Sequence, residues 1–271
     1  MNRKPVVAGS FYPGAKSSLE KDLRRLLNTD AAPRKALAVV APHAGYVYSG
    51  KVAGATFASA MIPKRCIVLC PNHTGMGREA SVWTGGGWEI PTGVVSVDEE
   101  LARKLISKTP ELADDSSAHL KEHSLEVELP FLLARQPEIS IVAIALSHLS
   151  VGSCKKIGEA IAEVISEAGE EILIVASSDM NHYESQTKTL EKDRLAIDRV
   201  LSLDAEGLLS VCGENRISMC GAVPTAVAII ASKKLGANKA SLVGHSTSGD
   251  VSGDYDSVVG YAGFLIEREG L

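Results

Sequence analysis

Residues 36–46 read ALAVVAPHAGY, an uninterrupted apolar run that ends at a proline and a histidine. Because polar residues do not alternate with apolar ones in this run, we expect a β-strand over Ala36–Ala41 that is buried on both faces of a sheet. Short apolar runs of this kind, each followed by a polar loop, recur along the chain. The further strands expected on this basis are Cys66–Cys70, Ile139–Leu146, Glu171–Ala176, Ser241–Gly244 and Ser257–Ile266.

Stretches with helical periodicity alternate with these strands. The predicted helices are Ser17–Leu27, Lys51–Ala60, Asp98–Lys108, Ser124–Ala134, Cys154–Ala168, Thr187–Leu201, Ala205–Cys212 and Ala222–Leu235. This alternation predicts an α/β fold, with a sheet covered by helices, as one domain over residues 1–271. Ser17 and Glu20 have the spacing of a helix capping box. The glycines 85–87 are interpreted as the tip of a hairpin within Ala80–Val97.

The composition excludes several classes of protein. Hydrophobic residues make up 45% and charged residues 23% of the 271 positions, as in ordinary globular domains. The net charge is −5 and only 4% of residues are aromatic, so we expect no binding to nucleic acid. No apolar run approaches the ~20 residues of a bilayer-spanning helix, so we expect no membrane association. Five cysteines without a secretory signal indicate a reducing, cytoplasmic location.

Histidines follow most of the predicted strands. The polar residues at these strand ends are His43, His73, His148, Asp179, His182 and His245. Ligands of open α/β sheets bind beyond the carboxyl ends of the strands, so these side chains are expected to converge on one crevice. Two imidazoles together with a third soft or anionic ligand would form an open metal site there. For each single histidine, a hydrogen bond within its own loop is the alternative.

Two further residues have two interpretations each. Cys220 precedes the predicted helix Ala222–Leu235, and a helix N-terminus favours a thiolate that binds metal or takes part in redox chemistry. Its alternative role is that of a small buried apolar residue. His123 precedes the predicted helix Ser124–Ala134. It is expected at the mouth of the site, where it would act as acid or base or support a metal ligand. Alternatively, it belongs to a helix start in which Glu126 is a capping partner.

Seven short motifs occur in order along the chain. They are Ala8-Gly9-Ser10-Phe11-Tyr12-Pro13, Ala41-Pro42-His43-Ala44-Gly45-Tyr46, Pro71-Asn72-His73, Glu122-His123-Ser124-Leu125-Glu126, Ser177-Ser178-Asp179, Cys220-Gly221 and Gly260-Tyr261-Ala262. This ordered set resembles the Memo family, a group of relatives of the class III extradiol dioxygenases, from near the N-terminus to about Ile266. The resemblance implies a single three-layer α/β/α domain with a largely parallel or mixed central sheet and a metal-capable crevice.

The resemblance also implies a set of site residues. The two histidines and one cysteine of the family's metal triad fall on His43, His73 and Cys220, and its neighbouring Asp and His fall on Asp179 and His182. The related dioxygenases hold iron with two histidines and a glutamate. A thiol in the third position favours copper(I) or zinc and remains compatible with iron. Family members are linked to iron or copper binding and redox chemistry, animal members to phosphopeptide binding, and microbial members to a radical-SAM protein of a shared pathway.

Three functions are consistent with these observations. In the first, the protein is a metal-dependent redox enzyme related to the class III extradiol dioxygenases, in which His182, oriented by Asp179, transfers protons and His123 assists. In the second, it is a catalytically inactive module that binds a peptide or a small anionic ligand in the same crevice. In the third, zinc activates water for hydrolysis with His182 as the base. The sequence has neither a Gly-x-Ser-x-Gly elbow nor a phosphate-binding glycine loop.

Overall fold

The computed structural model describes residues 2–29 and 32–270. Its strands are β1 (Ala38–Ala41), β2 (Arg65–Pro71), β3 (Ala80–Trp83), β4 (Gly87–Ile90), β5 (Gly93–Val97), β6 (Ala113–Asp114), β7 (Ser140–Leu146), β8 (Ile172–Ser177), β9 (His182–Glu184), β10 (Lys239–Thr247) and β11 (Val258–Glu267). Its α-helices are α1 (Lys16–Leu26), α2 (Gly50–Ser59), α3 (Glu99–Lys108), α4 (Leu129–Arg135), α5 (Val151–Ala168), α6 (Gln186–Leu201), α7 (Ala205–Glu214), α8 (Ala222–Lys234) and α9 (Gly249–Ser252). Two short 3-10 helices, η1 (Ser117–His119) and η2 (Glu126–Glu128), precede α4.

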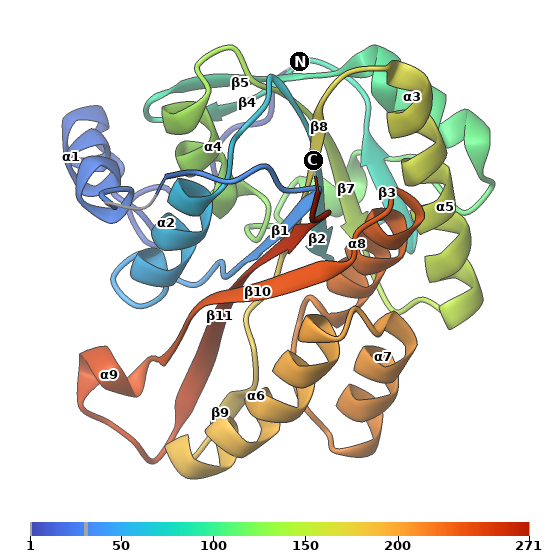
Figure 1. Cartoon of the computed structure of the whole chain (residues 1–271). Helices are drawn as coiled ribbons and strands as arrows, with labels where there is room; N and C mark the ends of the chain where they lie inside the picture. The colour runs from blue at the N-terminus through green and yellow to red at the C-terminus, as the bar shows by residue number, and fades with distance from the viewer. Residues whose placement is uncertain (1, 30–31, 271) are drawn as a thin grey trace.

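Four parallel strands form the centre of a mixed sheet (Figure 1). The main path of the sheet runs β10-β11-β1-β8-β2-β7-β3-β6. β1, β8, β2 and β7 are parallel to one another, whereas β11 is antiparallel to β1 and β3 is antiparallel to β7. The carboxyl ends of the four central strands therefore lie at the same edge of the sheet, where the loops after β1, β2 and β8 come together.

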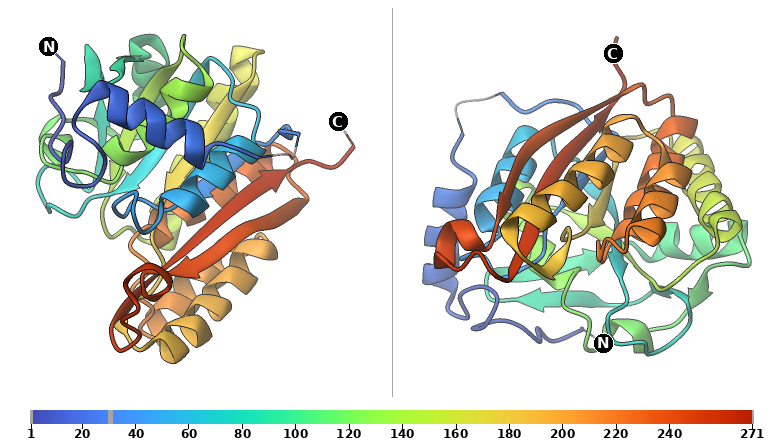
Figure 2. Two further views of the ribbon diagram at one scale, coloured as in Figure 1. Left: turned by 90° about the vertical axis from the view of Figure 1, so that its left-hand side faces the viewer. Right: turned by 90° about the horizontal axis from the view of Figure 1, so that it is seen from below.

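Helices cover both faces of this sheet, as the two views of Figure 2 show. Successive residues of a strand point to opposite faces. Accordingly, Val39 packs in a core that contains residues of α1, α2 and α4, and Val40 packs in a second core that contains residues of α3, α5, α7 and α8. Both valines are almost completely buried, which explains the apolar run in the sequence. The predicted three-layer α/β/α architecture with a mixed sheet is confirmed.

The predicted hairpin with its tip at glycines 85–87 is wrong. β3 pairs with β7 and β6, whereas β4 pairs with β5, so the hairpin turns at residues 91–92. The glycine segment instead connects two strands that do not pair with each other: Val82 of β3 packs beside α3, whereas Trp83 of β3 and Trp88 of β4 pack in the same core on the opposite side of the sheet. The pairing of β3 with β7 and β6 therefore outweighs the local turn preference of the glycines.

Two helix starts differ from the prediction. α1 begins after Ala15, which provides no side-chain cap, so Ser17 lies within the helix and Glu20 pairs with Lys16 instead of closing a capping box. The segment predicted as Ser124–Ala134 is divided into η2 and α4. Pro130 causes this division, because a proline has no N–H to donate to the carbonyl four residues earlier.

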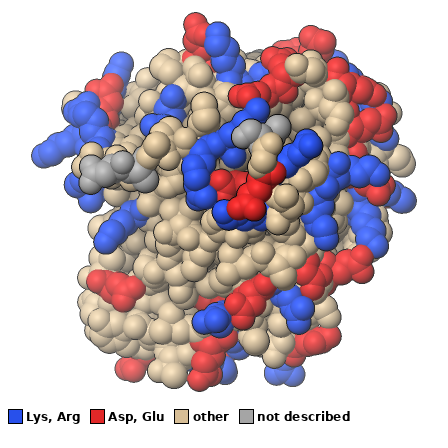
Figure 3. Space-filling model, in the orientation of Figure 1, with Lys and Arg blue, Asp and Glu red and all other residues tan. Residues whose placement is uncertain are grey.

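The exposed charges are mixed in sign. On the face shown in Figure 3, lysines and arginines are interspersed with aspartates and glutamates, and the described residues of this face form no extended patch of one sign. No helix among the described residues is both long and apolar enough to cross a bilayer.

Candidate metal centre

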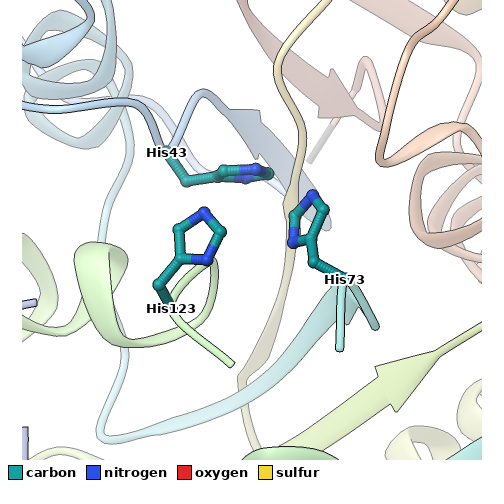
Figure 4. A group of neighbouring side chains, drawn as sticks. All are labelled: His43, His73 and His123. Atoms are coloured by element: carbon teal, nitrogen blue, oxygen red, sulfur yellow. The ribbon is translucent and has the colours of Figure 1, made fainter. Parts of the chain in front are cut away.

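Three imidazoles converge beyond the carboxyl ends of the central strands (Figure 4). His43 follows β1, His73 follows β2, and His123 lies in the loop between η1 and η2. One ring nitrogen from each histidine belongs to a set of atoms that all lie within 4.8 Å of one another. His43 is buried, His123 is half-buried and His73 is exposed, so the group faces partly toward solvent. Such a group could hold a metal ion.

The carboxylate of Glu122 fixes the tautomer of His73. Glu122 is fully buried, and its Oε1 lies 2.9 Å from His73 Nδ1 while its Oε2 accepts the backbone N–H of His73 at 2.6 Å. The hydroxyl of Ser124 donates to the same Oε1 at 2.7 Å. Desolvation by burial raises the pKa of Glu122, but the interactions with His73 and, to a smaller extent, the hydrogen bonds from Ser124 outweigh it and lower the pKa to about 2. An ionised carboxylate only accepts, so we assign the proton of His73 to Nδ1 and a free lone pair to Nε2.

At His43, the hydroxyl of Ser177 contacts Nδ1, as the carboxylate of Glu122 does at His73. Ser177 Oγ lies 2.8 Å from His43 Nδ1 and 2.8 Å from the carbonyl oxygen of Ser124, to which it can donate. Its lone pair then accepts the N–H of His43 Nδ1, so Nε2 carries the lone pair of this ring as well. Burial, followed by the neighbouring rings of His123 and His73, lowers the pKa of His43 well below its ordinary value and keeps the ring neutral.

Ring contacts determine the position of His123. The ring stacks on His73 with a centroid distance of 4.8 Å, and the edge of Phe11 approaches it at 5.0 Å. Its Nδ1 lies 3.5 Å from Glu122 Oε1. Desolvation by burial lowers the pKa of His123, while the negative charge of Glu122 opposes this effect. His123 was expected at the mouth of the site. In the structure it is a member of the imidazole group itself.

Cys220 lies beside this group. Its Sγ is 3.3 Å from His43 Nε2, and the backbone N–H of Asp179 donates to the sulfur at 3.3 Å. Burial raises the pKa of the Cys220 thiol, so the neutral thiol can donate its proton to the lone pair of His43 Nε2. Among the described residues, the three ligand atoms that lie within 4.8 Å of one another belong to His43, His73 and His123. Cys220, the third ligand implied by the resemblance, is not part of this set.

The side chains of Asp179 and His182 contact different parts of the protein. Asp179 Oδ1 accepts the backbone N–H groups of His43 at 2.8 Å and Ala44 at 3.3 Å, so the carboxyl holds the loop that carries His43. Burial raises the pKa of Asp179 to about 7. His182 Nδ1 instead lies 2.9 Å from the carbonyl oxygen of Ser218, to which it donates. The sequence-based prediction that Asp179 orients His182 is therefore corrected: Ser218 orients this ring.

The remaining histidines have separate environments. His245 lies within β10, which extends to Thr247, and its Nε2 is 2.8 Å from the buried carboxylate of Asp193. His148 follows β7 and is exposed. His119, in η1, is fully buried, and its Nε2 lies 3.0 Å from the carbonyl oxygen of Ser81. Of the histidines expected at strand ends, only His43 and His73 therefore belong to the imidazole group.

The N-terminal segment supports the loop that carries His123. Arg3 is buried, and its guanidinium contacts the carbonyl oxygens of His119 and Glu122 and lies 2.6 Å from Glu126 Oε2. Glu126 also accepts the backbone N–H of Val6 at 2.8 Å, along with the N–H of the next residue and the hydroxyl of Tyr12. Glu126 is thus an anchor for this segment, which corrects the interpretation of Glu126 as a helix cap.

Two supporting residues were not assigned a role from the sequence. Glu122 and Ser177 set the tautomers of two imidazoles, yet each is one residue within a longer motif. The only available signal was position: Glu122 directly precedes His123, and Ser177 ends a buried strand. Neither position indicates which ring the side chain contacts, because that contact depends on how different strands lie together.

Comparison with known proteins agrees with this architecture. The family model described as Memo-like protein matches residues 3–265. A MEMO1 family protein of Aquifex aeolicus is 42% identical over 97% of this chain and 98% of its own length. A MEMO1 family protein of Methanopyrus kandleri is 39% identical over 99% of this chain and 100% of its own.

A solved structure resembles this protein in fold although its sequence is very different. An uncharacterized protein of Escherichia coli K12, known from a crystal structure, matches with a TM-score of 0.56 over 84% of this chain and 98% of that chain. Its sequence identity is 12%, so this similarity concerns the fold alone. The family model and the relatives, by contrast, cover almost the whole sequence at about 40% identity. On these grounds, the chain belongs to the Memo family.

Proposed function

We propose that this protein is a metal-dependent redox enzyme with iron or copper as its metal. The observation that carries the proposal is the group of three imidazoles whose ligand atoms lie within 4.8 Å of one another. Two of the three rings have a hydrogen-bond partner at Nδ1, which would leave their Nε2 lone pairs available to a metal, the arrangement that supports histidine ligands in metalloproteins. Neutral imidazoles suit iron, copper and zinc.

We assign His43, His73 and His123 as the ligands, and Cys220 as the adjoining sulfur. The assignment of His123 follows from the common distance limit of the three rings. Cys220 was the third ligand expected from the family resemblance, and its contact with His43 Nε2 keeps it close enough to join the set when the thiol loses its proton. The bound metal would supply one-electron redox chemistry toward a substrate in the open part of the site.

The protein groups supply orientation and proton transfer. Glu122 and Ser177 hold the rings of His73 and His43, and Asp179 holds the backbone on which His43 is placed. His182 is the proposed proton-transfer residue. Its Nδ1–H is donated to Ser218, so its Nε2 is available to accept a proton from a substrate and later return it.

Metal analysis tests the ligand assignment. The protein is purified without added metal, and its metal content is compared with that of His43→Ala, His73→Ala, His123→Ala and Cys220→Ala. His148→Ala is the matched control, since His148 is exposed and lies outside the imidazole group. We expect each of the three imidazole variants to lose metal and the control to retain it. Unchanged metal content in both His43→Ala and His73→Ala would contradict the proposal. Retention in His123→Ala with loss in Cys220→Ala would transfer the third ligand to the sulfur.

Oxygen consumption then separates the redox proposal from its alternatives. Protein loaded with iron or copper is assayed for oxygen uptake with candidate reductants, and His182→Gln is compared with the unaltered protein. Uptake that depends on the metal and decreases in His182→Gln supports the proposed enzyme. Binding of a peptide or small ligand without turnover would support an inactive binding module. Hydrolysis of ester or phosphate substrates that requires zinc and stops with chelator would support a hydrolase.

A further inference from the structure

A cavity of about 780 Å³ opens beside the imidazole group. His73 and Cys220 form part of its wall, so it is continuous with the candidate metal centre. The rest of the wall comes from the loops that follow β2 and β7, the end of α7 and the start of α8. A cavity of this size accommodates a small organic molecule.

The wall of this cavity is mainly apolar. Among the described residues that line it, there is no Lys, Arg, Asp or Glu. The apolar part of the wall includes Leu146, Leu149, Leu209, Ile217, Met219 and Val223. A charged group that entered the part of this cavity away from the imidazoles would lose hydration without gaining an ionic partner there, which costs several kcal/mol. An uncharged apolar group would instead gain from removal of its surface from water.

Most polar groups of the wall are occupied by contacts within the protein. Thr74 donates its hydroxyl proton to Asn72 Oδ1 at 2.8 Å, and the side-chain amide of Asn72 donates to the carbonyl oxygen of Met76 at 2.8 Å. The side chains of Ser147 and His148 make no hydrogen bond within the part of the chain that the structure describes. They follow β7, the neighbour of the strand that precedes His73, and offer the polar contacts that orient an otherwise apolar ligand.

We infer that the substrate of the proposed metal centre is a small, uncharged and predominantly apolar molecule that occupies this cavity. The inference rests on the proposed function, because it takes the cavity as the substrate pocket of that centre. Two features favour an anion instead: the helix dipole at the start of α8, which lines the cavity at Ala222, and the positive charge that a metal held by the imidazoles would bring to the wall at His73. An anionic ligand is therefore the outcome that the experiment must be able to detect.

Two fluorescent probes with a common aromatic framework test the charge preference. N-phenyl-1-naphthylamine is neutral, and 8-anilino-1-naphthalenesulfonate adds one sulfonate. Both are titrated into the folded full-length protein, and the metal content of the same samples is measured. We expect saturable binding of the neutral probe and binding of the sulfonate that is weaker by on the order of tenfold, about 1.4 kcal/mol. Tighter binding of the sulfonate would overturn the inference.

Substitutions in the wall locate the bound probe. Val223→Phe on α8 and Leu149→Phe after β7 narrow the cavity from two different elements. Each is expected to weaken the neutral probe by about tenfold or more, whereas Val251→Phe, at a half-exposed valine of α9, leaves the binding unchanged. Thermal unfolding confirms that each variant is folded. Probe binding that is the same in both folded wall variants would place the probe elsewhere and contradict the inference.

The two measurements separate the two claims. Protein that holds metal through the imidazoles but does not bind the neutral probe would overturn the inference about the substrate and leave the proposed function in place. Protein that binds the probe in the cavity but takes up no metal would overturn the proposed function. Binding of probe and metal together, with the expected effects of Val223→Phe and Leu149→Phe, supports both.

Discussion

The Oε1 atom of Glu122 lies 2.9 Å from Nδ1 of His73, so a fully buried carboxylate determines which nitrogen of this imidazole carries a lone pair. The same oxygen accepts from Ser124 and lies 3.5 Å from Nδ1 of His123. One buried anion therefore touches two rings of the candidate metal centre. Its charge also compensates part of the positive charge that a bound metal would bring into this half-buried site.

Replacement of this anion is expected to weaken metal binding. Glu122→Gln keeps the shape of the side chain but removes the charge, so His73 becomes a poorer ligand. We expect the metal affinity to fall by roughly 10- to 100-fold. Competition with a chromophoric chelator measures the dissociation constant. Glu206→Gln, at an exposed ion pair with Lys155, is the control and should leave the affinity unchanged. An equal dissociation constant in Glu122→Gln and the unaltered protein would show that the carboxylate has no such role.

The ion pair of Arg3 and Glu126 is expected to contribute to stability through burial of both charges. Their side chains are 2% and 0% exposed. Arg3→Met would leave the Glu126 carboxylate buried without its cation, at a cost of about 3–5 kcal/mol in the free energy of unfolding. The double variant with Glu126→Gln should recover part of this loss, because no unpaired charge remains. Urea unfolding of the two variants measures both effects. A loss below about 1 kcal/mol in Arg3→Met would contradict the prediction.

The buried ring of His119 is expected to make the protein sensitive to acid. Burial lowers the pKa of His119 to about 4, so the folded state binds fewer protons than the unfolded state between about pH 4 and pH 6.5. The free energy of unfolding therefore decreases as the pH falls through this window, by about 3 kcal/mol at pH 4. His119→Gln can keep a hydrogen bond to the carbonyl oxygen of Ser81 and has no such titration.

Urea unfolding at a series of pH values compares the two proteins. The variant should lose less stability than the unaltered protein between pH 7 and pH 4. Glu122, with a pKa of about 2, adds its own loss only below about pH 4.5 and does so in both proteins. Parallel curves for the two proteins down to pH 4 would indicate that another group causes the acid sensitivity.

Gly54 tests the packing of α2 against α1, and Gly213 in α7 is the control. A Cβ atom at Gly54 would overlap the backbone carbonyl of Leu26, so Gly54→Ala forces the two helices apart. We expect a loss of about 1–3 kcal/mol in the free energy of unfolding. At Gly213, near the end of α7, a Cβ would meet no atom within 4 Å. Gly213→Ala should therefore stabilise the protein by about 0.5–1 kcal/mol through helix propensity. Equal changes in thermal stability for the two variants would disagree with this packing.

Hydrophobic patterning was sufficient to predict the fold class, an α/β domain with a sheet covered by helices, whereas the three-layer arrangement with a mixed sheet was implied by the family resemblance. The apolar runs that became β1, β2, β7 and β8 cannot remain exposed on either face, so a sheet covered by helices follows from the sequence. Strand ends also indicated where His43 and His73 lie. Pairing between strands was less predictable: the glycines at 85–87 have the composition of a hairpin tip, yet β3 pairs with β7 and β6 while β4 pairs with β5.

The arrangement of the candidate site was decided by tertiary structure. His73 and Glu122 are 49 residues apart in the sequence, and His43 and Ser177 are 134 apart, so no local pattern shows that these side chains meet. Asp179 and His182 are close in the sequence, but the loop between them directs one to the backbone of His43 and the other to Ser218. Hydrophobic periodicity reflects burial, which each segment displays in its own residues. Side-chain contacts depend on the relative placement of segments, which exists only after the whole sheet has formed.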